Sequence, residues 1–156
     1  MTASPTEGTP APDFSLPADG GATISLAALK GRKVVLYFYP KADTPGCTKE
    51  SMDFSRLKGK FERAGAAVIG VSADAVAAQD KFKAKHGLTI PLASDPDRDM
   101  IERYGVWVEK SMYGKQFMGI ERTTFLIDAN GVIRKVWRKV KVEGHAEEVL
   151  AAVKAL

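Results

Sequence analysis

The sequence has 156 residues, 45% hydrophobic and 27% charged, which is the composition of one ordinary globular domain with a core. Its net charge of +4 comes from basic and acidic residues that alternate along the chain, so no segment has the massed positive charge of a nucleic-acid-binding surface. No apolar run is long enough to span a membrane, and a single cysteine excludes an internal disulfide, a cysteine-based zinc site and a thioredoxin-type CxxC pair.

The first twelve residues are rich in Ser, Thr and Pro and contain neither a basic start nor an apolar stretch. We therefore expect no secretory signal and a cytoplasmic location. Residues 1–12 are predicted to form a flexible N-terminal arm. Neither repeats nor low-complexity linkers follow, so residues 13–156 are predicted to form a single domain.

Six segments have the patterning of β-strands. They are residues 13–16, 23–26, 34–39, 68–71, 124–127 and 132–136. The first two flank the turn sequence Asp19-Gly20-Gly21 and predict an N-terminal β-hairpin. The third and fourth are continuously apolar, which is typical of strands buried on both faces. The last two are joined through Asn130-Gly131, the strongest hairpin signal in the chain.

Four helices are predicted between and after these strands. The first covers about Cys47 to Ala64, and the second covers about Ala75 to His86. The third is short, with Asp95 as N-cap, Pro96 at the first helical position and Gly105 just past its end. The last helix has an apolar stripe formed by Ala146, Val149, Leu150 and Val153. Buried strands that alternate with helices, followed by a hairpin and a helix, predict an α/β domain with a central mixed sheet flanked by helices. A thioredoxin-like fold fits this order.

Cys47 follows the first buried strand, after a loop that starts at Pro40. The predicted helix begins at about the cysteine, so the thiol lies in the first turn. Free backbone N–H groups and the positive end of the helix dipole favour an anion there. A thiolate in such a position is a nucleophile at neutral pH. The alternative is an inert cysteine that packs as a small hydrophobic residue.

The helical projection places Cys47, Phe54 and Phe61 on one side, so we expect the cysteine to face inward. Glu50 projects towards the same apolar stripe. A buried carboxylate needs a cationic partner, so an arginine should enter from another element. The spacing equally allows Glu50 to point outward as an acidic residue at a helix start.

Pro40, Thr44 and Cys47 match the peroxiredoxin signature Pro-x-x-x-Thr-x-x-Cys, and the chain closely resembles this family. The resemblance to the bacterioferritin-comigratory (PrxQ) subfamily extends over most of the chain and includes residues 11–14, 105–107 and 119–128. It implies a thioredoxin-like fold and a thiol-dependent peroxidase that uses no metal, flavin or other cofactor.

The resemblance also implies a role for each site residue. Cys47 is expected to be the peroxidatic nucleophile, and Thr44 to hydrogen-bond the thiolate and the bound peroxide. Pro40 is expected to wall the pocket against water. Arg122 is expected to hold the thiolate and to stabilise the negative charge on the leaving oxygen, with Glu50 orienting it. The alternatives are a surface charge at a strand end for Arg122 and a loop cap for Thr44.

In the implied reaction the thiolate displaces water or alcohol from a hydroperoxide and becomes a sulfenic acid. Relatives with a second, resolving cysteine carry it five residues after the first, at Met52 here, or in the following helix, at about Lys83. Neither residue can form a disulfide. We therefore expect a 1-Cys enzyme that is recycled by an external thiol such as thioredoxin, glutaredoxin or glutathione.

The expected substrates are hydrogen peroxide and organic hydroperoxides, with no nucleic-acid or membrane partner. Without a long exposed apolar stretch or a heptad seam, we expect a monomer or a weak dimer. A thiol-based redox sensor or holdase that uses the same oxidation is the alternative function. A non-catalytic thioredoxin-fold binding module is a third interpretation, but it would not require Thr44 and Arg122 together with Cys47.

Overall fold

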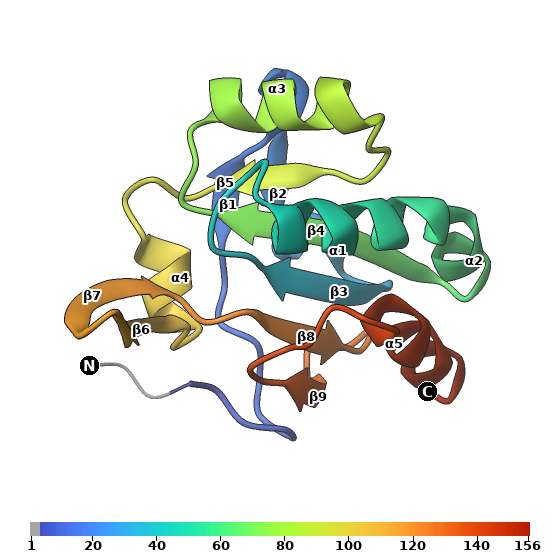
Figure 1. The fold of residues 1–156 in the computed structure, drawn as a ribbon. Helices are drawn as coiled ribbons and strands as arrows, with labels where there is room; N and C mark the ends of the chain where they lie inside the picture. Colours follow the sequence, from blue (N-terminus) through green and yellow to red (C-terminus); the bar gives the residue numbers. More distant parts are fainter. Residues whose placement is uncertain (1–3) are drawn as a thin grey trace.

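A five-stranded sheet with the order β5-β4-β3-β8-β9 lies at the centre of the computed structural model, which describes residues 4–156 (Figure 1). Its strands are β3 (Lys33–Phe38), β4 (Ala66–Ser72), β5 (Leu92–Ser94), β8 (Thr123–Ile127) and β9 (Ile133–Trp137). β3, β4 and β5 are parallel to one another, β8 runs antiparallel to β3, and β9 runs antiparallel to β8. The predicted α/β domain with a central mixed sheet is therefore confirmed.

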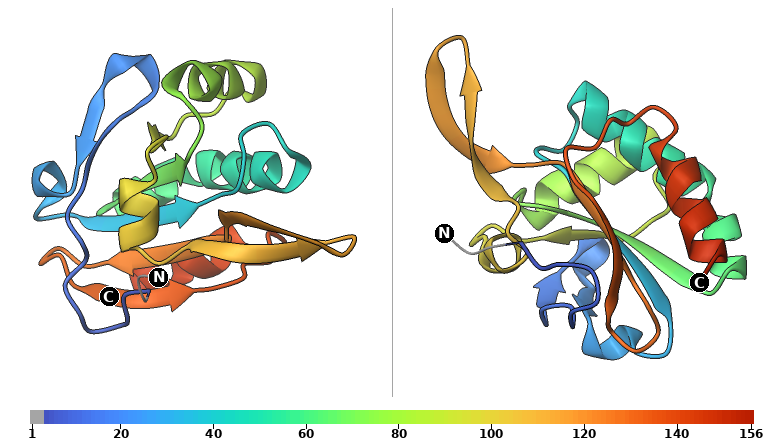
Figure 2. Two further views of the ribbon diagram at one scale, coloured as in Figure 1. Left: turned by 90° about the vertical axis from the view of Figure 1, so that its left-hand side faces the viewer. Right: turned by 90° about the horizontal axis from the view of Figure 1, so that it is seen from below.

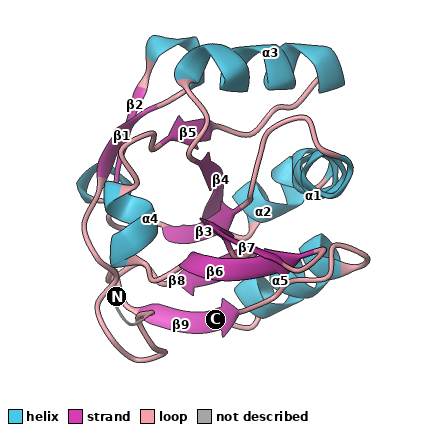
Figure 3. Cartoon of the chain, turned by 60° about the vertical axis from the view of Figure 1, so that its left-hand side comes forward, coloured by secondary structure: helices cyan, strands magenta, loops and turns pink. Residues whose placement is uncertain are grey.

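Within the described residues, five α-helices pack around this sheet (Figure 3). They are α1 (Pro45–Arg56), α2 (Lys58–Arg63), α3 (Val76–His86), α4 (Asp99–Arg103) and α5 (His145–Lys154). The apolar stripe predicted for the last helix is buried, as expected. No helix among residues 4–156 combines the length and the apolar character that a membrane crossing requires.

β3 separates two hydrophobic cores because its side chains alternate between the faces of the sheet. Val35 and Tyr37 point into the core formed with α1, α2, α3 and α5. Val34 and Leu36 point into the other core, which includes α4 and the N-terminal hairpin. Both faces of β3 are covered, which explains why its sequence is apolar at almost every position.

Two hairpins lie outside the central sheet. The N-terminal one, predicted from its alternating sequence, pairs β1 (Ser15–Pro17) with β2 (Thr23–Ser25) around a 3₁₀ turn, and a second 3₁₀ turn follows β2. The other pairs β6 (Trp107–Met112) with β7 (Lys115–Ile120) and projects from the body of the molecule (Figure 2). It was not predicted because much of it is exposed on both faces, so its sequence lacks the alternation of a half-buried strand.

The helix predicted from Cys47 to Ala64 is in fact two helices. α1 ends at Arg56, and Leu57 separates it from α2 with φ −95° and ψ 2°. The Leu57 N–H donates to the carbonyl oxygens of both Asp53 and Ser55, which tightens the last turn and ends the helix. The break leaves the buried side chains of both helices in the core.

The short helix also begins later than predicted. Arg98 adopts a left-handed backbone conformation, with φ +62°, so Pro96 lies in a turn and the helix starts at Asp99. Asp95 still caps it from outside, because its carboxylate accepts a hydrogen bond from the Ile101 N–H at 2.8 Å.

The described part of the predicted N-terminal arm, residues 4–12, makes backbone contacts with the central sheet. The Gly8 N–H donates to the Ile133 oxygen at 2.7 Å, and the Ile133 N–H donates to the Thr9 oxygen at 2.9 Å. The backbone groups of this segment pair with the outer edge of β9, which has no other strand beside it. Residues 1–3 of the predicted arm lie outside the described residues.

Candidate active site

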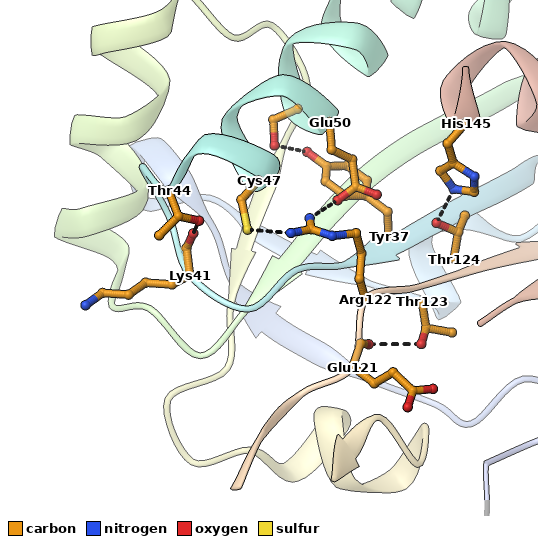
Figure 4. Close-up of polar contacts among 11 residues, drawn as sticks. Tyr37, Lys41, Thr44, Cys47, Glu50, Glu121, Arg122, Thr123, Thr124 and His145 are labelled. Carbon is orange, nitrogen blue, oxygen red and sulfur yellow. Dashed lines mark hydrogen bonds and ion pairs between the residues drawn. The ribbon is translucent and has the colours of Figure 1, made fainter. Parts of the chain in front are cut away.

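Cys47 lies in the first turn of α1, immediately after the loop that leaves β3 (Figure 4). Thr44 has the extended backbone of an N-cap residue, and Pro45 occupies the first helical position, where its missing N–H has no cost. The cysteine is 1% exposed and belongs to the core beneath α1. The prediction that it faces inward is therefore confirmed.

Arg122 reaches this cysteine from the short link between β7 and β8. Its Nη2 donates to Cys47 Sγ at 3.3 Å, and its Nη1 donates to Glu50 Oε1 at 2.7 Å (Figure 4). The Val140 N–H donates to the Arg122 carbonyl oxygen at 3.0 Å, and this hydrogen bond holds the backbone of Arg122 in place. An arginine thus enters from another element, as the buried position of Glu50 predicts.

Glu50 is 1% exposed and faces the interior, so the alternative of an outward-pointing acidic residue is wrong. Burial raises the pKa of Glu50 to about 7, although the ion pair with Arg122 acts in the opposite direction. Its second carboxyl oxygen, Oε2, is buried and has no hydrogen-bond partner among the described residues.

Thr44 does not make the hydrogen bond to Cys47 that the family resemblance implies. Its hydroxyl donates to the Lys41 carbonyl oxygen at 2.8 Å (Figure 4). This is the loop-cap geometry that was the alternative. The extended backbone of an N-cap residue turns the side chain back over the preceding loop, so the hydroxyl stabilises that loop.

Pro40 is half-buried at the end of β3, where its lack of an N–H ends the strand ladder. The following loop is held by contacts that sequence reasoning missed. Asp43 has a left-handed backbone with φ +62°. Its carboxylate accepts a hydrogen bond from Lys85 Nζ at 2.9 Å and forms a second hydrogen bond with His86 Nε2 at 2.7 Å. These partners lie on α3, more than forty residues away, so no local pattern could indicate them.

Gly46 is a second feature of the site that sequence reasoning missed. A Cβ atom at this position would lie 3.1 Å from Arg122 Nη2, which is closer than ordinary van der Waals contact. The absence of a side chain therefore lets the guanidinium approach the sulfur of Cys47. A glycine directly before the cysteine was the available signal.

Two buried polar pairs lie behind the site. Tyr37 Oη donates to Ser51 Oγ at 2.9 Å, and His145 Nε2 is hydrogen-bonded to Thr124 Oγ1 at 2.8 Å (Figure 4). Burial lowers the pKa of His145 to about 4, so this histidine is neutral at pH 7. Among residues 4–156, no three His, Cys, Asp or Glu side chains are grouped to hold a metal ion.

Together these contacts place a buried thiol beside a cation. The thiol lies in the first turn of a helix, and a guanidinium lies within hydrogen-bond distance of its sulfur. Both features favour the thiolate. The same guanidinium can stabilise negative charge that develops on an oxygen attached to the sulfur. The arrangement is suited to nucleophilic attack by sulfur on a substrate whose leaving group becomes an oxyanion.

Known proteins resemble the chain over almost its full length. Residues 8–136 match the AhpC/TSA family. A putative peroxiredoxin bcp of Coxiella burnetii is 54% identical over 143 residues, which cover 92% of this chain and 95% of that protein. Peroxiredoxin Bcp of Xanthomonas campestris is 51% identical over 94% of this chain and 92% of the relative.

Solved structures of peroxiredoxins have the same fold as this chain. The Xanthomonas campestris bacterioferritin comigratory protein, described for its alkyl peroxide reduction activity, has a TM-score of 0.87 and 49% identity, with 91% of this chain and 90% of that chain covered. A cysteine mutant of Xylella fastidiosa PrxQ has a TM-score of 0.89 and 40% identity, with coverage of 97% and 98%. The predicted thioredoxin-like fold is thereby confirmed.

Proposed function

Because the chain belongs to the AhpC/TSA family, as a peroxiredoxin of the Bcp/PrxQ type with thiol peroxidase activity, we propose that Cys47 is its reactive residue and that an external thiol recycles it. The observation that carries this proposal is the Arg122 guanidinium at 3.3 Å from Cys47 Sγ in the first turn of α1.

In the proposed reaction, the Cys47 thiolate attacks one oxygen of a hydroperoxide. An S–O bond forms as the O–O bond breaks, and the product is Cys47 sulfenic acid with water or an alcohol. Arg122 lies where it can stabilise the charge on the leaving oxygen, and Glu50 holds the guanidinium from its other end. The substrates are hydrogen peroxide and organic hydroperoxides. Pro40, half-buried at the start of the loop, limits access of water to the sulfur.

Thr44 is proposed to bind the peroxide by redirecting its hydroxyl from the Lys41 carbonyl to the substrate. Replacement Thr44→Val should slow Cys47 oxidation by about 10- to 100-fold, since it removes one hydrogen bond to a charged transition state. Stopped-flow oxidation rates measure this effect.

Thr44→Ser is the matched control, because it keeps the hydroxyl and should have a mild effect. Equal oxidation rates in Thr44→Val and the wild type would remove Thr44 from the site and leave it as a loop cap only.

We propose a 1-Cys mechanism because this chain has one cysteine. Two solved mutants of Xanthomonas campestris peroxiredoxin Q replace two different cysteines, so that relative has a second one. At the positions where a second cysteine is expected, this chain has Met52, which is 47% exposed on α1, and Lys83 on α3, which forms a partly buried ion pair with Asp19 of the N-terminal hairpin. Neither can resolve a sulfenic acid.

Oxidation by one equivalent of peroxide should therefore add one oxygen to the protein mass without forming a disulfide. Glutathione should then convert Cys47 to a mixed disulfide, which a second thiol reduces. Excess peroxide should drive Cys47 on to sulfinic acid, because no internal thiol traps the intermediate. Mass spectrometry and non-reducing gels distinguish these species.

The rival outcome is a dimer linked through two Cys47 residues, which burial of the sulfur makes slow. If that dimer forms first at low peroxide and is the species reduced during turnover, the 1-Cys mechanism is wrong. Repeated turnover with thioredoxin, glutaredoxin or glutathione supplied in turn identifies the reductant. A redox sensor would instead be oxidised once and stop.

We also propose that the protein is a monomer or a weak dimer in a reducing compartment such as the cytoplasm, where a free reactive thiol persists. The feature that bears on weak association is the projecting β6–β7 hairpin, whose exposed apolar side chains are Met112, Tyr113, Phe117 and Met118. These four side chains offer a smaller apolar area than the surface that a permanent dimer buries.

A further inference from the structure

Two acidic groups share the guanidinium of Arg122 at the centre of the site (Figure 4). One is the thiol of Cys47 and the other is the carboxyl group of Glu50, and both residues are only 1% exposed. A thiolate and a carboxylate together carry two negative charges, whereas the guanidinium supplies one positive charge. The guanidinium cannot compensate the second negative charge, which would lie at a buried position, and this is strongly unfavourable.

Charge balance is restored when the pair formed by Cys47 and Glu50 holds one proton. While the sulfur is anionic, that proton belongs on Glu50. Arg122 donates to Oε1 of the carboxyl group, but the second oxygen, Oε2, is buried without a hydrogen-bond partner in the described part of the chain, so an ionised carboxylate would be stabilised at only one of its two oxygens. Burial raises the pKa of Glu50 to about 7, which makes the protonated form accessible at neutral pH.

The other ionisable groups near the pair come from each neighbouring element. They are Asp53 on α1, Tyr37 on β3, Tyr39 directly after β3, Lys110 on β6 and His145 at the start of α5. Burial keeps the two tyrosines and the histidine neutral at pH 7, because it raises the pKa of each tyrosine and lowers the pKa of the histidine to about 4. The aspartate raises the pKa of Glu50 further. The lysine, whose own pKa burial lowers, interacts with Arg122 and Cys47.

We propose that Glu50 is protonated while Cys47 is a thiolate and becomes ionised when Cys47 is oxidised, so that its proton neutralises the leaving oxygen. This inference rests on the proposed role of Cys47. The thiolate gives two electrons to the peroxide as the S–O bond forms and the O–O bond breaks. The leaving RO⁻ gains the Glu50 proton and becomes ROH, while sulfur keeps the OH group as sulfenic acid. Arg122 then faces one anion, the Glu50 carboxylate.

Recycling returns the proton. An external thiol converts the sulfenic acid to a mixed disulfide and releases water. A second thiol then displaces Cys47 as a thiolate, and the proton of this second thiol returns to Glu50. Each turnover therefore restores one proton to the pair formed by Cys47 and Glu50, and Glu50 is a proton-holding group as well as a positioning residue for Arg122.

Proton counting during a single oxidation tests this role. One equivalent of hydrogen peroxide is added in weakly buffered solution with a pH indicator, near pH 7, after absorbance has shown that Cys47 is a thiolate. The wild type should take up one proton fewer per oxidised Cys47 than Glu50→Gln, whose amide still accepts a hydrogen bond from Arg122. Asp53→Asn, an acid-to-amide change one turn away on α1, should match the wild type. Equal counts in the wild type and Glu50→Gln would overturn the proposal.

A measurement on the wild type alone covers the case in which Glu50→Gln does not fold. The infrared difference spectrum between oxidised and reduced protein should lose the C=O band of a protonated carboxyl group, and this band should shift in D₂O. A spectrum without that loss would overturn the proton-holding role. Mass spectrometry of the same samples reports Cys47 oxidation, and its absence would instead overturn the proposed function.

Discussion

Cys47→Ser should abolish peroxide consumption while leaving the fold intact. The serine hydroxyl is not ionised at neutral pH, so the variant has no anionic nucleophile in the first turn of α1. Removal of a side-chain nucleophile costs on the order of 10⁴- to 10⁶-fold in rate in other enzymes, and we expect a loss of this size. Serine is close in size to cysteine and can still accept a hydrogen bond from Arg122, so the packing beneath the helix should change little.

Peroxide consumption in the presence of excess thiol measures the activity, and circular dichroism with thermal unfolding measures the fold. Met52→Ser is the matched control, since it replaces the other sulfur-containing side chain of α1, which is exposed and outside the site. This control should retain turnover. Wild-type rates in Cys47→Ser would show that another group carries the reaction.

Arg122→Met should lower the rate of Cys47 oxidation by about 10²- to 10³-fold, the cost of removing one donor that stabilises an oxyanion in a transition state. Arg122→Lys should recover only part of the rate, since a single ammonium group cannot reproduce the fork that binds both Cys47 and Glu50.

Loss of Arg122 also leaves the buried Glu50 carboxyl group without its hydrogen-bond partner, and an unsatisfied buried polar group costs about 1–3 kcal/mol of stability. The double variant Arg122→Met with Glu50→Met replaces both partners with apolar side chains, so it should regain stability but not rate, which separates this effect from catalysis. Arg134→Met removes a surface arginine and is the control. An unchanged oxidation rate in Arg122→Met would exclude Arg122 from the reaction.

The sequence predicts those parts of the molecule whose surroundings leave a periodic pattern. β3 is continuously apolar because both of its faces are buried, and Cys47 shares its side of α1 with Phe54 because that side faces the core. The buried Glu50 even predicts its arginine, since a carboxylate in the interior requires a cation. The roles of the site residues came from the family resemblance and are still predictions.

Other features depend on contacts between distant segments and leave no local pattern. The β6–β7 hairpin is exposed on both faces, and β5 has only three residues, so neither has a recognisable period. Asp43 is fixed by residues of α3. The direction of the Thr44 hydroxyl depends on the backbone of one residue, which composition does not determine.

The segment before β1 affects the solubility of the protein. Residues 7–11 cover the outer edge of β9 with backbone and side-chain hydrogen bonds, including one from the Val136 N–H to the Glu7 carboxylate at 3.1 Å. A bare strand edge pairs readily with a strand of another molecule, which is a common route to aggregation. A chain shortened by its first dozen residues would keep Cys47 and Arg122 but would expose this edge, so the truncation should reduce the solubility of the protein.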